Sequence, residues 1–292
     1  ALLFSLEVPI SSGFYNIQSN AGKLKFWGHE LSVSSKNLTG KLQWTTDLNV
    51  SYNDNKCLQL GVDDAPIIGN NITQVGERIG QFYGLVWEGV YKNKEEFDKY
   101  PKHAQADVGT IRFKDVNGDG KVTQGDDRDI IGNPVPLWIV GMTNSFTYKN
   151  FDLSILGTYS IGGKVYDSLY AGSMEVMYAG NTWNKHALRR WQQPGDITDV
   201  PRIQIGGSYT ASDRFLVDAS YFAIKNITLG YTIPKQWLKK AGLESVRIFG
   251  SVDNLALFSH LDGMDPQYNF KGETDYSYAP NKTYSVGFEI NF

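Results

Sequence analysis

The stretch Tyr284-Ser285-Val286-Gly287-Phe288-Glu289-Ile290-Asn291-Phe292, with which the chain ends, decides the fold class. Its apolar and polar side chains alternate strictly, and a period of two predicts a β-strand with one apolar and one polar face. A segment of about ten such residues is long for a soluble sheet and suits a tilted membrane strand. The terminal segment therefore favours a transmembrane β-strand.

The same alternation recurs along the chain, at Lys41–Tyr52, Phe151–Ser160 and Asn226–Thr232, with Leu156 as the one apolar residue on a polar side. Weaker strands are predicted at Leu2–Val8, Lys25–Lys36, Leu137–Tyr148 and Ser245–Leu255. Together these segments predict about eight strands.

The composition agrees with an all-β chain, since 13% of residues are aromatic, 30 are Gly and only 20% are charged. The net charge of −3 leaves no basic face for a phosphate backbone, so we expect no nucleic-acid partner. Cys57 is the single cysteine and lies in no metal-ligand spacing. No run approaches the roughly 20 apolar residues of a spanning helix, and Ala1–Ile10 lacks the pattern of a secretory signal.

The polar sides of these strands carry mostly Ser, Thr, Asn and Gly, which suit a wet lumen. A soluble sandwich would instead present many Lys and Glu residues to water. We therefore expect an antiparallel barrel segment whose apolar side faces lipid. Two alternatives stay open: a soluble calcium-dependent carbohydrate-binding β-sandwich, and a small closed barrel acting as an adhesin or structural protein.

The connections also alternate in length. Lys149-Asn150 predicts a two-residue turn with Asn in the left-handed conformation, and Asn55-Lys56 is interpreted as a turn or a strand end. Long loops are predicted at 61–136, 162–217 and 259–281. Short turns on one rim and long loops on the other are typical of outer-membrane barrels. Local helices are predicted at Lys94–Tyr100, Trp183–Gln192 and Pro234–Ala241, with Pro234 in the first helical position.

One motif could bind a metal ion, the run from Asp115 to Asp126 that reads D-V-N-G-D-G-K-V-T-Q-G-D. Its spacing offers oxygens to Ca²⁺ from Asp115, Asn117, Asp119, the Lys121 carbonyl and Asp126. It departs from an EF-hand because Asp replaces the final Glu and because Thr110–Lys114, just before it, is predicted to be a strand. The alternative is a turn held by its own Asx hydrogen bonds.

Nothing in the sequence predicts an enzyme, because no G-x-S-x-G or H-E-x-x-H motif occurs and the four His residues are scattered. Aromatic residues in or beside the long loops allow two interpretations: they stack on sugars or peptides, or they pack the loops together and form the interfacial girdle. They are Trp87, Tyr91, Tyr166, Tyr170, Tyr178, Trp183 and Trp191.

A series of motifs in fixed order resembles the SusC/RagA-type TonB-dependent transporters of Bacteroidetes, and it covers nearly the whole chain. The motifs are Gly80–Gly84, Gly109–Asp115 running into Asp119-Gly120, Ile131–Pro134, Asn150–Leu153, Tyr221–Tyr231 and the terminal Phe292.

The resemblance implies a barrel of about 22 strands with an N-terminal plug, energised through TonB. It also implies import of oligosaccharides or peptides with a SusD-like surface lipoprotein. By this comparison the chain supplies about the last eight strands, the long loops are extracellular, and Phe292 resembles the signal read by the barrel-assembly machinery.

The chain departs from the family pattern because it contains no signal peptide, plug or TonB-contacting segment. Eight strands cut from a larger barrel also expose two unpaired edges, which lipid does not tolerate. We therefore expect residues 1–292 to be the C-terminal portion of a longer polypeptide or one piece of a split barrel.

Overall fold

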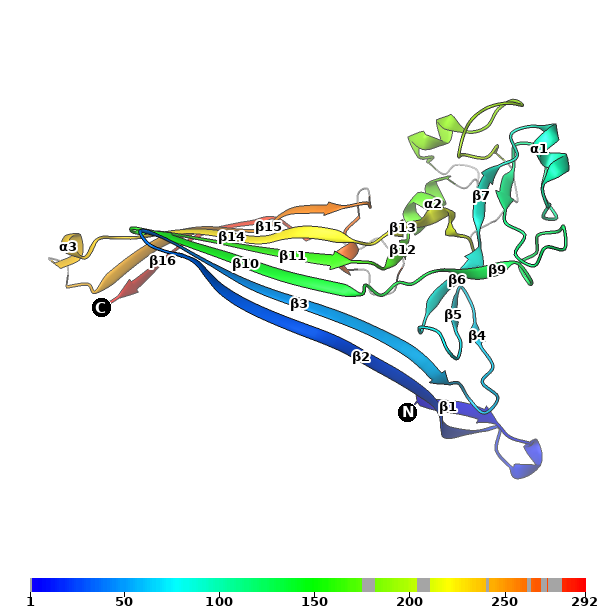
Figure 1. Ribbon diagram of the computed structural model, residues 1–292, viewed down its shortest axis with the longest axis horizontal. Coiled ribbons are helices and arrows are strands. Elements are labelled where there is room, and N and C mark those ends of the chain that lie inside the picture. Colours follow the sequence, from blue (N-terminus) through cyan, green and yellow to red (C-terminus); the bar gives the residue numbers. More distant parts are fainter. Residues whose placement is uncertain are drawn as a thin grey trace.

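A computed structural model describes residues 2–174, 182–203, 211–239, 242–261, 264–268, 272 and 280–292. Its main element is an antiparallel eight-stranded sheet in the order β1-β2-β3-β10-β11-β14-β15-β16 (Figure 1). The strands are β1 (Leu2–Glu7), β2 (Asn16–Thr39), β3 (Leu42–Gln59), β10 (Trp138–Tyr148), β11 (Phe151–Ile161), β14 (Tyr221–Thr232), β15 (Ser245–Ser259) and β16 (Thr283–Asn291).

This sheet confirms the predicted all-β fold and its eight strands. Each strand pairs with the strand that precedes it in the sheet order, while β1 and β16 lie at opposite edges, so the barrel is not closed within this chain. β2 begins earlier and β3 ends later than the alternation predicts. None of the helices among the described residues combines the length and the apolar character that crossing a membrane would need.

Short connections gather at one end of the sheet and long ones at the other (Figure 1). The predicted turn between β10 and β11 is present, but Lys149 and not Asn150 has the positive φ, 54°. Asn150 is held instead by β14, since its Nδ2 donates to the Thr232 carbonyl at 2.7 Å. The expected turn or strand end at Asn55-Lys56 is wrong, because both residues pair with β2 inside β3.

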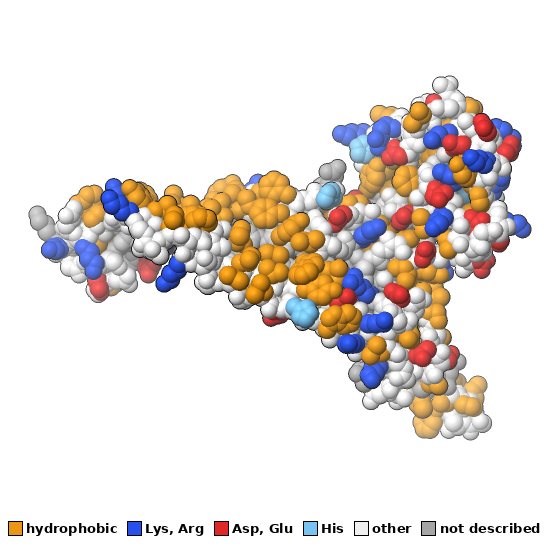
Figure 2. All heavy atoms as spheres, in the orientation of Figure 1, with side chains coloured by type: hydrophobic (Ala, Val, Ile, Leu, Met, Phe, Trp, Pro, Cys, Tyr) orange, Lys and Arg blue, Asp and Glu red, His pale blue; other side chains and the backbone are white. Residues whose placement is uncertain are grey.

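One face of the sheet is apolar and exposed. Rings on neighbouring strands stack there, such as Trp44 with Phe146 at a centroid distance of 5.6 Å and Phe222 with Phe258 at 6.1 Å. Figure 2 shows these hydrophobic side chains as a broad band over the sheet, while charged side chains gather on the loops and near the turns. A sandwich would cover this band with a second sheet, and the described residues place none there.

The apolar face has one polar row. The Thr46 hydroxyl and the Trp44 Nε1 both donate to Asn144 Oδ1, at 2.7 and 2.9 Å, and Asn37 Nδ2 donates to Thr46. Because these groups satisfy one another across three strands, they avoid much of the cost of an unpaired polar group in an apolar environment.

The long loops contain their own short strands, of which only β8, within the predicted strand Thr110–Lys114, is confirmed from the sequence. β4 (Ile67–Ile68), β5 (Asn71–Thr73), β6 (Gln81–Leu85) and β9 (Arg128–Gly132) form one sheet, β7 (Trp87–Val90) pairs with β8 (Ile111–Phe113), and β12 (Lys164–Tyr166) pairs with β13 (Leu216–Asp218).

The helical segments are short. They are α1 (Lys94–Lys99), α2 (Ser168–Met174), α3 (Lys235–Leu238), and the 3-10 turns η1 (Ile10–Ser12), η2 (Lys185–Arg189), η3 (Asp213–Phe215) and η5 (Pro266–Tyr268). α1 confirms its prediction, because Asn93 caps it by accepting from the Glu96 N–H. The helix predicted from Trp183 is only η2, and Pro234 precedes α3 as its N-cap.

Candidate functional site

The loops carry the packed cores of the molecule. One cluster joins Leu85, Ile111, Phe113 and Val122, and a second joins Ala171, Met174, Ala187, Val200 and Phe215. Residues of the first and second long loops also pair directly, since the Leu85 N–H donates to the Ala211 carbonyl at 2.7 Å. We call the packed parts of residues 61–136 and 162–217 the loop head.

The predicted aromatic residues of the first loop pack within this head. Tyr91 is fully buried, its hydroxyl donates to the Pro101 carbonyl, and its ring meets Phe97 edge-on. Trp87 packs against the first cluster, and its Nε1 donates to the Gly89 carbonyl at 3.0 Å.

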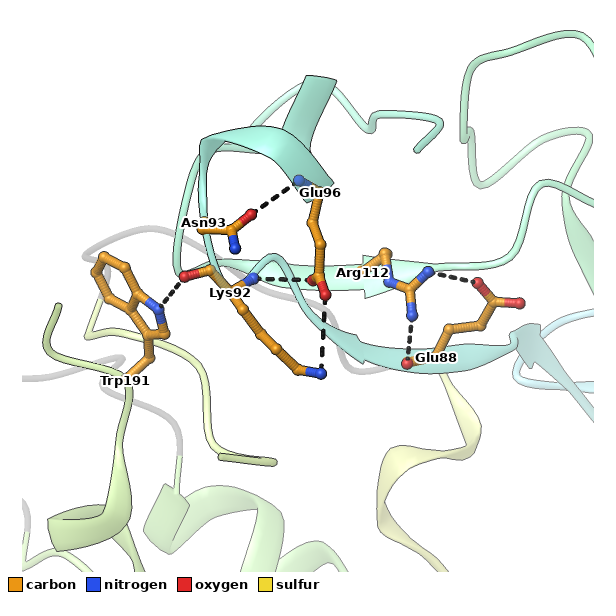
Figure 3. Close-up of polar contacts among 6 residues, drawn as sticks. All are labelled: Glu88, Lys92, Asn93, Glu96, Arg112 and Trp191. Carbon is orange, nitrogen blue, oxygen red and sulfur yellow. Dashed lines mark hydrogen bonds and ion pairs between the residues drawn. The ribbon is translucent and has the colours of Figure 1, made fainter. Parts of the chain in front are cut away.

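Trp191 links the two long loops. Its Nε1 donates to the Lys92 carbonyl at 3.0 Å (Figure 3), and its ring lies against Gly109, which has a φ of +84°. The Glu96 carboxylate accepts the Lys92 N–H at 3.1 Å. The Arg112 guanidinium contacts Glu88 twice, as an ion pair with its carboxylate and as a donor to its carbonyl (Figure 3). The head is thus held by aromatic packing together with partly exposed ion pairs.

The remaining predicted aromatic residues belong to the second loop. Tyr166, Tyr170 and Trp183 pack against the second cluster, and the Tyr170 hydroxyl lies 3.1 Å from Nδ1 of His186. Tyr178 lies outside the described residues. The six described aromatics therefore pack the head together, and their contact with a substrate or partner stays a prediction.

A partly buried carboxylate joins the two loops at a position that the sequence did not predict. Asp213 accepts the Trp87 N–H at 2.6 Å. Burial raises the pKa of Asp213, although this hydrogen bond opposes the rise. No sequence signal marks Asp213, because its partner is 126 residues away.

The run Asp115–Asp126 forms a tight turn that its own side chains organise. Both Asp115 carboxylate oxygens accept backbone N–H groups, from Gly118 at 2.7 Å and Gly120 at 2.8 Å. Asn117 accepts from the Asp119 N–H at 2.9 Å, and Asp119 from the Lys121 N–H at 2.8 Å. These are the Asx hydrogen bonds of the alternative interpretation.

Asp126 does not face the other expected ligands, since its carboxylate accepts the Thr123 hydroxyl at 3.1 Å. Its neighbour Asp127, which sequence reasoning missed, is fully buried and accepts backbone N–H groups of Val116 at 2.9 Å and Thr123 at 2.8 Å. Burial acts to raise the pKa of Asp127, but these donors hold it below its ordinary value. The only signal for Asp127 is the Asp-Asp pair that ends the motif.

Among the described residues, no group of three His, Cys, Asp or Glu side chains is arranged to hold a metal ion. The turn is held by its Asx hydrogen bonds, and Ca²⁺ binding stays a prediction of the motif.

Comparisons with known proteins identify the relatives of this chain. Over its full length it is 32% identical to TonB-dependent receptor P3 of Formosa agariphila and 26% identical to TonB-dependent receptor SusC of Bacteroides thetaiotaomicron. Over its whole length the chain is similar to TonB-dependent receptors of the SusC/RagA type. No family model matches it. It spans 31% of the length of P3 and 29% of SusC.

Solved structures of this family share the fold. The RagAB peptide transporter matches the whole chain with a TM-score of 0.80 at 20% identity, and the chain covers 32% of that protein. The RagAB peptide importer in its closed-closed state matches equally well, at 21% identity. The SusC/RagA resemblance predicted from the ordered motifs is confirmed.

Phe292, the terminal aromatic of this SusC/RagA-type chain, follows β16 and is 90% exposed. It continues the apolar face formed by Val286, Phe288 and Ile290, all of which are exposed to some degree. Its role as a signal for barrel assembly stays a prediction.

Proposed function

We propose that this chain forms the C-terminal wall of an outer-membrane importer, with the apolar face of its sheet in lipid and the polar face toward the lumen. The observation that carries the proposal is the open sheet itself, which leaves large apolar side chains uncovered on seven of its strands, while the two clusters of the loop head bury theirs. A protein in water would bury such a face, because large exposed apolar patches are unfavourable there. A bilayer solvates it.

The proposal includes how the loops work. The loop head stands at the long-loop rim, where an extracellular substrate and a SusD-like lipoprotein would arrive, and transport proceeds by movement of loops and plug without covalent chemistry. The energy comes from TonB acting on an N-terminal part of the receptor outside this chain. Relatives named as a peptide transporter and as SusC support import of peptides or oligosaccharides.

The two alternatives make different predictions about the same structure. A small closed barrel requires β1 to pair with β16, and in the described residues these strands are opposite edges of the sheet. A soluble sandwich requires a cover for the apolar face. The edges and the exposed face both favour a larger barrel that other strands complete.

The experiment is extraction of the natural protein from outer membranes, followed by measurement of its intact mass and of the proteins that copurify. We expect detergent to be required, a mass several times the 32.7 kDa of this chain, and a copurifying lipoprotein. A 32.7 kDa protein that is released without detergent contradicts the importer. A detergent-dependent protein of that same mass supports the small barrel instead.

A further inference from the structure

Two β-bulges lie side by side near the long-loop end of the sheet. On β14, Lys225 is an extra residue, because its neighbours Ile224 and Asn226 pair with consecutive residues of β11. On β15, the pairing skips from Ala256 to Asp253, and Asn254 between them has a φ of 52°. Bulges are over-represented at barrel rims and beside functional sites, where they re-aim a side chain.

These bulges border a cavity of about 640 Å³ at the long-loop end of the sheet. Residues of both faces line it, because Phe258 lies on the apolar face, where it stacks with Phe222, while Ala223 and Leu257, which pair with each other, lie on the opposite face. This volume falls within the roughly 300–1,000 Å³ typical of small-ligand pockets.

The cavity contains two lysines without acidic partners. Lys225 and Lys282 both line it, and neither forms an ion pair with any described residue. Lys282 is placed by its neighbour, because the Asn281 carbonyl accepts a hydrogen bond from Asn254 Nδ2 at 3.2 Å. The second bulge therefore helps to bring Lys282 to the same cavity as Lys225.

Among the described residues that line the cavity, Asp265 is the one acid, and it is already engaged. Both Asp265 carboxylate oxygens accept from the Gln267 side-chain amide, at 2.9 and 3.0 Å, and Oδ1 also accepts the Gln267 backbone N–H at 2.9 Å. Leu257, Leu261 and Met264 supply apolar walls. Lys225 is partly buried and Lys282 is exposed. Two ammonium groups that no described carboxylate neutralises, beside apolar walls, attract an anion more strongly than the same groups in open water would.

We propose that this cavity is a subsite for a carboxylate group of the imported oligomer, which Lys225 and Lys282 bind together. The inference rests on the proposed import function and narrows its substrate class to oligomers that carry an anionic group. Such a group is the uronate of a saccharide or the C-terminus of a peptide.

The experiment uses the full-length receptor with whatever lipoprotein copurifies, and it compares matched charged and neutral probes. One pair is tetragalacturonate and its methyl ester, and the other is tetra-alanine and its C-terminal amide. We expect wild type to bind one of the acids at least tenfold more tightly than its neutral partner, and the pair that shows this difference identifies the source of the carboxylate.

The double variant Lys225→Gln/Lys282→Gln should bind that acid about as weakly as its neutral partner, while binding of the neutral probe stays unchanged. Lys225→Arg/Lys282→Arg should retain the preference, and Lys41→Gln, which removes an exposed lysine in the turn between β2 and β3 at the opposite end of the sheet, should have no effect. Heat-modifiable migration on gels checks that each variant folds.

A wild-type receptor that binds acids and neutral probes equally, or a Gln variant that weakens both alike, overturns the subsite and leaves the import function standing. The import function has its own failure, release of the protein from membranes without detergent. The two outcomes are therefore distinguishable.

Discussion

The sheet and the loop head are stabilised in opposite ways. The sheet exposes large apolar side chains such as Leu229, Phe258 and Phe288, and is held by backbone pairing from β1 to β16. The head buries its large side chains, including Tyr91, Phe113 and Phe215, in clusters of its own. The exposed apolar sheet suits a lipid environment, and the buried clusters of the head suit water. We therefore expect a substitution to change the stability of one region and to leave the other region intact.

The largest expected effect comes from a charge on the lipid side of the sheet. Ile227 lies on the apolar face midway between the aromatic rows at Phe222 and Tyr231. In the full-length receptor, Ile227→Arg should destabilise the folded barrel by about 3 kcal/mol, as expected for Arg near the bilayer midplane. Urea unfolding in lipid vesicles measures the change.

The matched control is Thr228→Arg, one residue along the same strand. Thr228 points to the other face, where Ser154 and Ser251 lie opposite it and leave room for a long side chain. We expect less than a third of the loss. If both variants lose equal stability, the two faces of the sheet meet similar surroundings and the lipid assignment is wrong.

The second effect is confined to the loop head. Gly109 has a φ of +84°, and a Cβ built there would lie 2.3 Å from the Trp191 ring. Gly109→Ala should cost about 2 to 3 kcal/mol, because it combines left-handed strain with overpacking. Limited proteolysis should then cut the second long loop faster, while heat-modifiable migration of the barrel is retained.

Gly76→Ala separates the two causes. Gly76 also has a positive φ, +94°, but no atom lies within 4 Å of the added Cβ. Gly76→Ala should therefore cost only the backbone strain, and it should raise the rate of proteolysis less than Gly109→Ala does. Equal sensitivity of the two variants would mean that the contact between Trp191 and Gly109 does not hold the loops together.

The contrast between regions also explains what the sequence could predict. Strand β16 could be predicted because its side chains from Tyr284 to Ile290 alternate between the two faces of the sheet. Residues two positions apart therefore share an environment. Bulges break this local rule. Lys225 looks like an ordinary strand residue, and only the pairing of β14 with β11 shows that it is an extra one.

The loop head was less predictable for a physical reason. Trp191 meets Lys92, 99 residues away, and Asp213 meets Trp87, 126 residues away, so no local pattern encodes either contact. The Asp115 motif was visible because Asx turns act over two to five residues. Its buried acceptor Asp127 was missed because the EF-hand template ends one position earlier.

The smallest expected effect tests that turn and its pH dependence. Asp127 is buried and its carboxylate accepts backbone N–H groups from Val116 and Thr123. Asp127→Asn keeps only one acceptor oxygen, and it should cost the turn about 1.5 kcal/mol, within the range for hydrogen bonds to a charged group. Asp126→Asn is the control, since Asp126 is exposed and accepts from Thr123 alone.

The pKa of Asp127 is lower in the folded protein than its ordinary value of 3.8. The stability that the Asp127 carboxylate contributes to the turn is therefore fully present above pH about 3.8, and it is lost as the pH falls through the lower pKa of the folded state. Hydrogen exchange of the Val116 and Thr123 amides should speed up on acidification in wild type but change little with pH in Asp127→Asn, after correction for intrinsic exchange. Added Ca²⁺ should slow this exchange if the motif binds the ion, and an unchanged rate would leave the Asx hydrogen bonds as the whole basis of the turn.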